Sequence, residues 1–292
     1  MDYVNCQLCP RRCGVDRTVG QRGFCGCPEG ALVAKSMLHK WEEPALAGNG
    51  GSGAVFFGGC TMGCKYCQNA AISGGPVGQA MDSAQLRRLF EDLIAQGAEN
   101  IDLVTPTHFL PTILPALTPK LSVPVVYNCG GYERTETLRE LEGKVDIYLP
   151  DLKYADPRLG QALSGAANYF PVATAAIREM VRQTGPVVLE DGLLKKGVVI
   201  RHLILPSQVA QAKAVMDWVA ENFARGEVLF SLMSQYTPWG DLSHHPELNR
   251  RLRKGEISSA TEYMQNLDLP GFCQERTSAK EEYTPPFDLT GL

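Results

Sequence analysis

The chain has 292 residues, of which 28 are Lys or Arg and 32 are Asp or Glu, and its formal net charge is −4. This balance argues against a nucleic-acid-binding protein, because phosphate binding is led by clustered Lys and Arg. No apolar run approaches the roughly 20 residues of a membrane span, and the amino terminus carries no basic-then-apolar export signal. We therefore expect a cytoplasmic protein that binds neither nucleic acid nor a membrane.

The first 50 residues are rich in Cys, Gly and Arg and show little periodicity. They predict a metal-binding extension, because so polar a segment buries too little apolar surface to fold alone. Its five cysteines have the spacing C-x2-C-x3-C-x11-C-x-C: Cys6, Cys9, Cys13, Cys25 and Cys27. In a reducing compartment such clusters favour metal binding or redox chemistry over disulfides. The spacing does not choose between an auxiliary [4Fe-4S] cluster, structural zinc and redox-active thiols. The glycine-rich segment 47–54 reads as a hinge into the next domain.

From residue 51 to 240 the pattern alternates short apolar runs with helical stretches. The runs are continuous rather than alternating, as in strands that are covered on both faces. We expect strands at 54–58, 100–105, 124–128, 145–152, 197–205 and 227–233. We expect helices at 83–97, which opens on a Ser cap and closes on Gly97, and at about 107–118, 133–142, 168–183 and 208–224. The segment 241–292 carries one further helix, around 246–265, and ends in a proline-rich stretch.

Parallel strands joined by crossover helices leave two architectures, a doubly wound open sheet and a full or partial (β/α) barrel. Both gather their ligands at the carboxyl ends of the strands. Polar residues at that edge are therefore candidates for the functional site, and His108 and His202 among them are expected to be hydrogen-bonded core or rim histidines. The other candidates are Cys60, Thr105, Thr107, Asn128, Asp151, Lys153, Arg201 and Gln235.

A loop with the spacing C-x3-C-x2-C follows the first expected strand. Cys60, Cys64 and Cys67 stand on it, behind Gly58 and Gly59, which suit a backbone that bends around a bulky core. A zinc site more naturally takes two cysteine pairs from two loops, and a ferredoxin cluster takes a fourth cysteine. Three thiolates leave one iron of a cluster open, and an open coordination position is where a metal binds substrate.

The stretch "CTMGCKYC" (residues 60–67) resembles the CxxxCxxC signature of the radical S-adenosylmethionine (SAM) superfamily, including an aromatic residue, Tyr66, before the third cysteine. The resemblance implies a partial (β/α)6 TIM-like barrel. It also implies a [4Fe-4S] cluster whose open iron binds SAM, reductive cleavage to a 5′-deoxyadenosyl radical, and hydrogen abstraction from a substrate. A flavodoxin or ferredoxin would supply the electron.

A closer resemblance, to pyruvate formate-lyase activating enzymes, covers about residues 52–240. "PDLKY" looks like that group's Asp-x-Lys, which implies that Asp151 and Lys153 hold the methionyl end of SAM. By the same resemblance Arg201 binds the methionyl carboxylate, Asn128 contacts the ribose, and Gln235 is a further contact. The group's Gly-Gly-Glu is replaced here by "VTPTHF", where Thr105 and Thr107 are expected to take over the amino-group contact.

The resemblance makes activation of a glycyl radical enzyme the leading expectation for function. Radical modification of a peptide or small molecule beside an auxiliary cluster is the alternative. A rival from another class is a non-catalytic iron–sulfur carrier, which has no need of a polar pocket. "CPRRCGVDR", "LMSQYTP" and "FDLTG" resemble a little-characterised branch of activating-enzyme homologues with a Cys-rich amino terminus.

Overall fold

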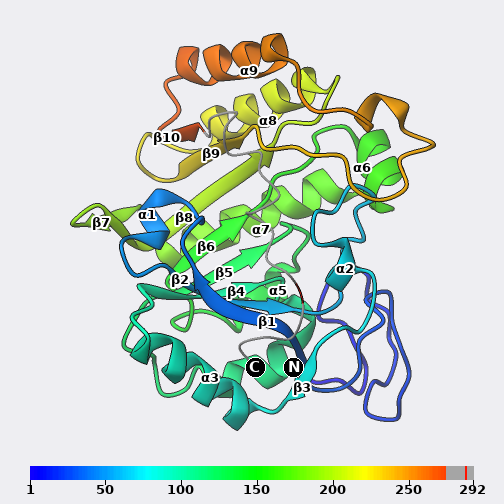
Figure 1. The fold of residues 1–292 in the computed structure, drawn as a ribbon, viewed down its shortest axis with the longest axis vertical. Coiled ribbons are helices and arrows are strands. Elements are labelled where there is room, and N and C mark those ends of the chain that lie inside the picture. The colour runs from blue at the N-terminus through cyan, green and yellow to red at the C-terminus, as the bar shows by residue number, and fades with distance from the viewer. Residues whose placement is uncertain (274–286, 288–292) are drawn as a thin grey trace.

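The computed structural model describes residues 1–273 and Phe287. Six parallel strands form the centre of the sheet and follow one another in chain order, as the sequence predicted. They are β2 (Ser52–Phe57), β4 (Asn100–Val104), β5 (Val125–Cys129), β6 (Ile147–Pro150), β8 (Leu193–Leu203) and β9 (Leu229–Met233). The architecture is a partial (β/α)6 barrel, whose curved sheet is visible in Figure 1.

Helices connect these strands. They are α2 (Ala70–Ser73), α3 (Ser83–Ala95), η1 (Thr107–Phe109), α4 (Leu110–Ala116), α5 (Thr135–Arg139), α6 (Pro157–Ser164), α7 (Tyr169–Thr184) and α8 (Val209–Asn222). The cap of α3 is Asp82 rather than the expected Ser83, because the Asp82 carboxylate accepts the Gln85 N–H and completes a capping box. The helix expected at 246–265 begins only at Lys254, as α9 (Lys254–Asn266), after the short η2 (Pro246–Leu248).

Four strands were not predicted: β1 (Ala31–His39), β3 (Gln79–Met81), β7 (Val188–Glu190) and β10 (Gly271–Cys273). The strand β1 lies within the first 50 residues, which show little periodicity, and it pairs antiparallel with β2. The helix α1 (Pro44–Ala47) follows it. The segment 47–54 is therefore not a hinge, since Gly53 lies inside β2 opposite Leu38. A side chain at Gly50 would lie 2.1 Å from the carbonyl oxygen of Gly97, so glycine allows the close approach there.

The core has two layers, one on each face of the sheet. Because side chains alternate along a strand, neighbouring strand residues belong to different layers. Val125, Tyr127 and Tyr148 belong to the large cluster that includes the helices. Their neighbours Val126 and Ile147 instead pack with Ala45 and Leu46 of α1 on the concave face. Because side chains alternate along a strand, Asn128 shares that concave face with Val126. Asp151 and Arg201 likewise share it with Leu149 and Val199.

Within the described residues, no helix is long and apolar enough to cross a membrane. The proline-rich ending that the sequence pointed to lies outside the described residues apart from Phe287, which packs at 5.7 Å between ring centroids against Phe56.

Candidate active site

The three-cysteine loop leaves the carboxyl end of β2 and leads into α2. Each thiol receives a hydrogen bond in the structure. The N–H of Met62 donates to Cys60 over 3.3 Å, the hydroxyl of Ser73 donates to Cys67 over 3.3 Å, and the hydroxyl of Ser164 donates to Cys64 over 3.1 Å. Donors aimed at the sulfurs are a feature of iron–sulfur ligands, because they stabilise the negative charge on the sulfur.

Burial raises the pKa of the Cys60 thiol to about 12, and burial also raises the pKa of Cys67. A bound metal would favour the thiolate form of both. Three thiols on one loop, each with a hydrogen-bond donor, fit the ligation of a [4Fe-4S] cluster.

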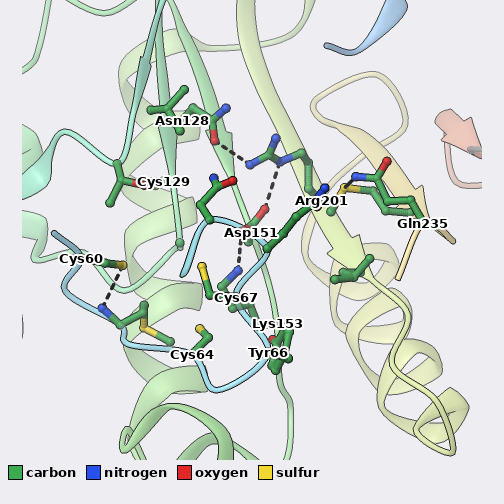
Figure 2. Close-up of a pocket in the computed structure, with 18 of the residues that line it drawn as sticks. Cys60, Cys64, Tyr66, Cys67, Asn128, Cys129, Asp151, Lys153, Arg201 and Gln235 are labelled. Carbon is green, nitrogen blue, oxygen red and sulfur yellow. Dashed lines mark hydrogen bonds and ion pairs between the residues drawn. The ribbon is translucent and has the colours of Figure 1, made fainter. Parts of the chain in front are cut away.

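Charged side chains face the thiols across the concave face, as Figure 2 shows. The ammonium of Lys153 donates to Oδ2 of Asp151 over 2.5 Å, and Nε of Arg201 donates to Oδ1 of Asp151 over 3.0 Å. Nη2 of Arg201 also donates to the side-chain oxygen of Asn128 over 2.6 Å. Burial opposes ionisation of Asp151, but Lys153 and Arg201 outweigh it, so the pKa of Asp151 lies below its usual value.

These residues line one cavity of about 260 Å³. It contains almost all the residues that the sequence assigned to the barrel site: Cys60, Cys64, Tyr66, Cys67, Thr105, Asn128, Asp151, Lys153, Arg201 and Gln235. The hydroxyl of Tyr66 accepts a hydrogen bond from Tyr154 over 2.8 Å, which fixes the ring beside the third cysteine.

Thr107 does not line this cavity. It is buried in η1, where its hydroxyl donates to Oε1 of Glu133 over 2.8 Å and accepts from Tyr127 over 3.1 Å. Thr105 does line the cavity, and its backbone is left-handed with a φ of 59°.

His108 and His202 are both buried and bond to the backbone carbonyls of Gly58 and Leu152, which agrees with their expected role as core histidines.

Sequence reasoning missed the last residue of β1 and the residues that follow it. His39, Trp41, Glu42 and Glu43 line the cavity, and Nη1 of Arg201 donates to Glu42 over 3.2 Å. Sequence reasoning also missed Ser73 and Ser164, whose hydroxyls donate to the thiols of Cys67 and Cys64. The apolar run "ALVAKSML" (31–38) was the available signal for β1, and it would have placed the next residues at a strand end.

The amino-terminal cysteines lie outside the cavity. Cys13 accepts the N–H of Phe24 over 3.3 Å, and the thiol of Cys27 donates to the carbonyl of Gly58 over 3.4 Å, directly behind the three-cysteine loop. The buried guanidinium of Arg17 donates to the carbonyls of Pro28 and His108 and lies 4.0 Å from the thiol of Cys6. A metal or cluster at these five cysteines stays a prediction.

Comparison with known proteins adds two sequence matches. Residues 46–109, which include the three-cysteine loop, match the family model described as a 4Fe-4S single cluster domain. The uncharacterized protein MJ0674 of Methanocaldococcus jannaschii is 30% identical over 283 residues, which span 91% of this chain and 77% of that protein.

Solved structures share the fold at low identity. SuiB of Streptococcus suis, solved with S-adenosylmethionine, superposes with a TM-score of 0.50 at 13% identity, over 74% of this chain and 48% of SuiB. The chain thus spans about half the length of that protein. A spore photoproduct lyase superposes with a TM-score of 0.50 at 12% identity, over 75% of this chain and 74% of the lyase. The chain therefore shares the fold of SuiB and of the lyase, and the partial barrel that the sequence predicted is confirmed.

Proposed function

Since the chain belongs to the same family as the uncharacterized protein MJ0674 of Methanocaldococcus jannaschii, whose name states no activity, we propose a function from the site itself: a radical SAM enzyme. The observation that carries the proposal is one cavity in which Cys60, Cys64 and Cys67 face Asp151, Lys153 and Arg201. The matching 4Fe-4S family model and the structural likeness to SuiB support it.

In this proposal Cys60, Cys64 and Cys67 hold a [4Fe-4S] cluster and leave one iron open to SAM. A reduced cluster held there would supply the electron for cleavage of SAM to methionine and a 5′-deoxyadenosyl radical. The ionised Asp151 keeps Lys153 and Arg201 charged and oriented, because it accepts from both. These two cations bind the carboxylate of the methionyl group, which in a buried cavity gains more from a charged partner than it would in water.

Asn128 and Gln235 are the proposed contacts to the rest of SAM, and Thr105 is the residue left to contact the amino group. Phe56, Val104 and Met62 contribute apolar side chains to the cavity wall. Such a wall excludes water from the radical, which would otherwise be lost to side reactions.

Two substrate classes follow from this chemistry. Activation of a glycyl radical enzyme rests on the resemblance of "PDLKY" and "VIRHLILP" to the activating enzymes. Modification of a peptide or small molecule is the second candidate, and what supports it is the likeness to SuiB, which was also solved with its precursor peptide SuiA. In both cases a flavodoxin or ferredoxin is the proposed electron donor.

A non-catalytic iron–sulfur carrier is a weaker proposal, because a carrier does not need the buried Asp151, Lys153 and Arg201 beside its cluster. The test is anaerobic incubation of the reconstituted protein with dithionite and SAM. We expect 5′-deoxyadenosine from the wild type and none from Cys64→Ala. A reconstituted wild type that contains its iron but forms no 5′-deoxyadenosine would refute the enzyme proposal.

A further inference from the structure

The inner end of the cavity is acidic, and the proposed binding of SAM does not use it. Glu42 and Glu43 line this end from the segment between β1 and α1, and Asp102 of β4 lies beside Glu42, behind the cavity wall. Glu43 is 2% exposed and Asp102 is fully buried at 0%. Buried carboxyl groups are rare unless they are paired, so this end of the cavity requires an explanation.

Strand positions place these acids deeper than the three-cysteine loop. Asp102 lies two residues before the end of β4. Ser231, whose hydroxyl donates to Oε1 of Glu43 over 2.6 Å, lies two residues before the end of β9. At the rise of an extended strand, two residues correspond to about 7 Å. The acids therefore lie below the rim on which the thiols and Lys153 stand, and α1 closes the barrel beneath them.

Part of this acidic group has no partner. Among the described residues, Oε2 of Glu43 and Nδ1 of the neighbouring His39 make no hydrogen bond. The carboxyl of Asp102 accepts from Asn128 over 3.3 Å and shares a hydrogen bond with the carboxyl of Glu42. An unpaired buried oxygen of a carboxylate loses its water without compensation, so a bound group that donates hydrogen bonds is the missing element.

The nearby cation, Arg201, already donates to three other side chains. Arg201 directs Nε to Asp151, Nη1 to Glu42 and Nη2 to Asn128, and it directs no nitrogen to Glu43. Burial raises the pKa of Glu43, and the neighbouring Glu42 raises it further, against the lowering effect of Arg201. Burial and Glu42 also raise the pKa of Asp102. Burial thus disfavours the ionised form of both carboxyls, which a cation placed beside them would favour.

We propose that Glu42, Glu43 and Asp102 bind a cationic nitrogen group of the substrate, either an amino or a guanidinium group. Such a group carries several N–H donors and a positive charge, which match carboxylate oxygens that lack both. The inference rests on the proposed function for the position of SAM at the rim. It adds the substrate class: an amine or guanidine that enters the barrel interior below SAM.

Calorimetric titration of the reconstituted protein, with SAM bound, tests this proposal. The probes are agmatine, for a small molecule, and acetyl-arginine methylamide and acetyl-lysine methylamide, for a peptide side chain. Acetyl-citrulline methylamide is the neutral counterpart of the arginine probe. We expect at least one cation to bind roughly 10-fold or more tightly than the citrulline probe, because the charge strengthens the hydrogen bonds. Binding should release protons, detected as a dependence of the heat on the buffer.

The variants Glu43→Gln and Asp102→Asn should each weaken that cation by roughly 10-fold or more while they leave SAM binding and iron content unchanged. Glu136→Gln, on an exposed acid that pairs with Arg134, is the matched control and should bind the cation as the wild type does. The proposal is wrong if no cationic probe is preferred over citrulline, if both variants bind the cation normally, or if they weaken SAM equally. A protein that binds the cation but not SAM would instead contradict the proposed function alone.

Discussion

The hydroxyl of Ser164, at the end of α6, donates to the thiol of Cys64 over 3.1 Å although the two residues are 100 positions apart. The same hydroxyl is also within hydrogen-bond distance, 2.8 Å, of the Tyr154 hydroxyl, which donates to Tyr66. The second half of the barrel therefore contributes to the environment of a thiol on the first loop.

We expect Ser164→Ala to lower the reduction potential of the cluster. A hydrogen bond to a ligating sulfur stabilises the reduced, more negative cluster, so its loss favours the oxidised form. Potentiometric titration followed by electron paramagnetic resonance measures the change, with iron content as the check for assembly. Ser83→Ala is the matched control, because the Ser83 hydroxyl donates to the carbonyl of Thr112 and not to a thiol. An unchanged potential in an intact Ser164→Ala protein would contradict this role.

Lys153→Ala should weaken SAM binding by roughly 10- to 100-fold while it leaves the iron content intact, because one charge-assisted bond to the carboxylate is lost. Equilibrium binding of SAM, together with iron and sulfide assays, separates the two effects. Lys120→Ala removes a lysine that pairs with Asp146 on the surface, and it should change neither quantity. Equal losses of SAM affinity and iron in Lys153→Ala would make Lys153 a structural residue.

Gly59→Ala should disrupt the three-cysteine loop. Gly59 has a φ of 75°, and a side chain there would lie 2.2 Å from the sulfur of Cys27. We expect the free energy of unfolding to fall by roughly 3 kcal/mol or more, and reconstituted iron to fall with it. Gly30→Ala is the control, since Gly30 has a similar φ of 81° and nothing within 4 Å. It should cost only the strain of a left-handed residue, about 1 to 2 kcal/mol. Equal effects of the two substitutions would rule out the steric contact as the cause.

Burial lowers the pKa of His202 from 6.5 to about 4 in the folded chain, although the carbonyl of Leu152 partly opposes the shift. The unfolded chain takes up this proton first, so the stability contributed by His202 is complete above pH 6.5 and is lost as pH falls toward 4. Between pH 7 and 5 the wild type should lose about 2 kcal/mol more than His202→Gln, which retains a donor for Leu152. Urea unfolding of the wild type and of His202→Gln at the two pH values measures how much stability each protein loses. Equal losses in the two proteins would disprove the assignment of this pH dependence to His202.

The amino-terminal cysteines can be tested by metal analysis. If they hold an auxiliary cluster, Cys6→Ala combined with Cys9→Ala should remove about four irons per chain, the content of one [4Fe-4S] cluster. The wild type and the variant are reconstituted in parallel and assayed for iron and zinc. If the zinc content is lower in the variant while the iron content is unchanged, the structural-zinc alternative is established instead.

The sequence by itself determined the number of the parallel strands and the residues at their carboxyl ends, and the family resemblance chose the barrel order. Continuous apolar runs between helical stretches can be recognised from neighbouring residues alone. Parallel strands then bring their carboxyl ends to the same edge, whatever the details of packing. For this reason Cys60, Asn128, Asp151 and Arg201 could be assigned to one site before the fold was known. The spacing of Cys60, Cys64 and Cys67 can likewise be recognised before the fold is known.

Only the tertiary structure decided which other side chains reach that site. The segment after β1 enters the barrel because β1 pairs antiparallel with β2, a long-range contact that its mixed composition concealed. Ser164 reaches the thiol of Cys64, and Asp102 reaches Asn128, through packing and strand register, which no local pattern specifies. Thr107 shows the converse, since it follows a strand end but turns into the core toward Glu133. Position along a strand fixes the edge at which a residue lies, whereas backbone direction and packing decide where its side chain points.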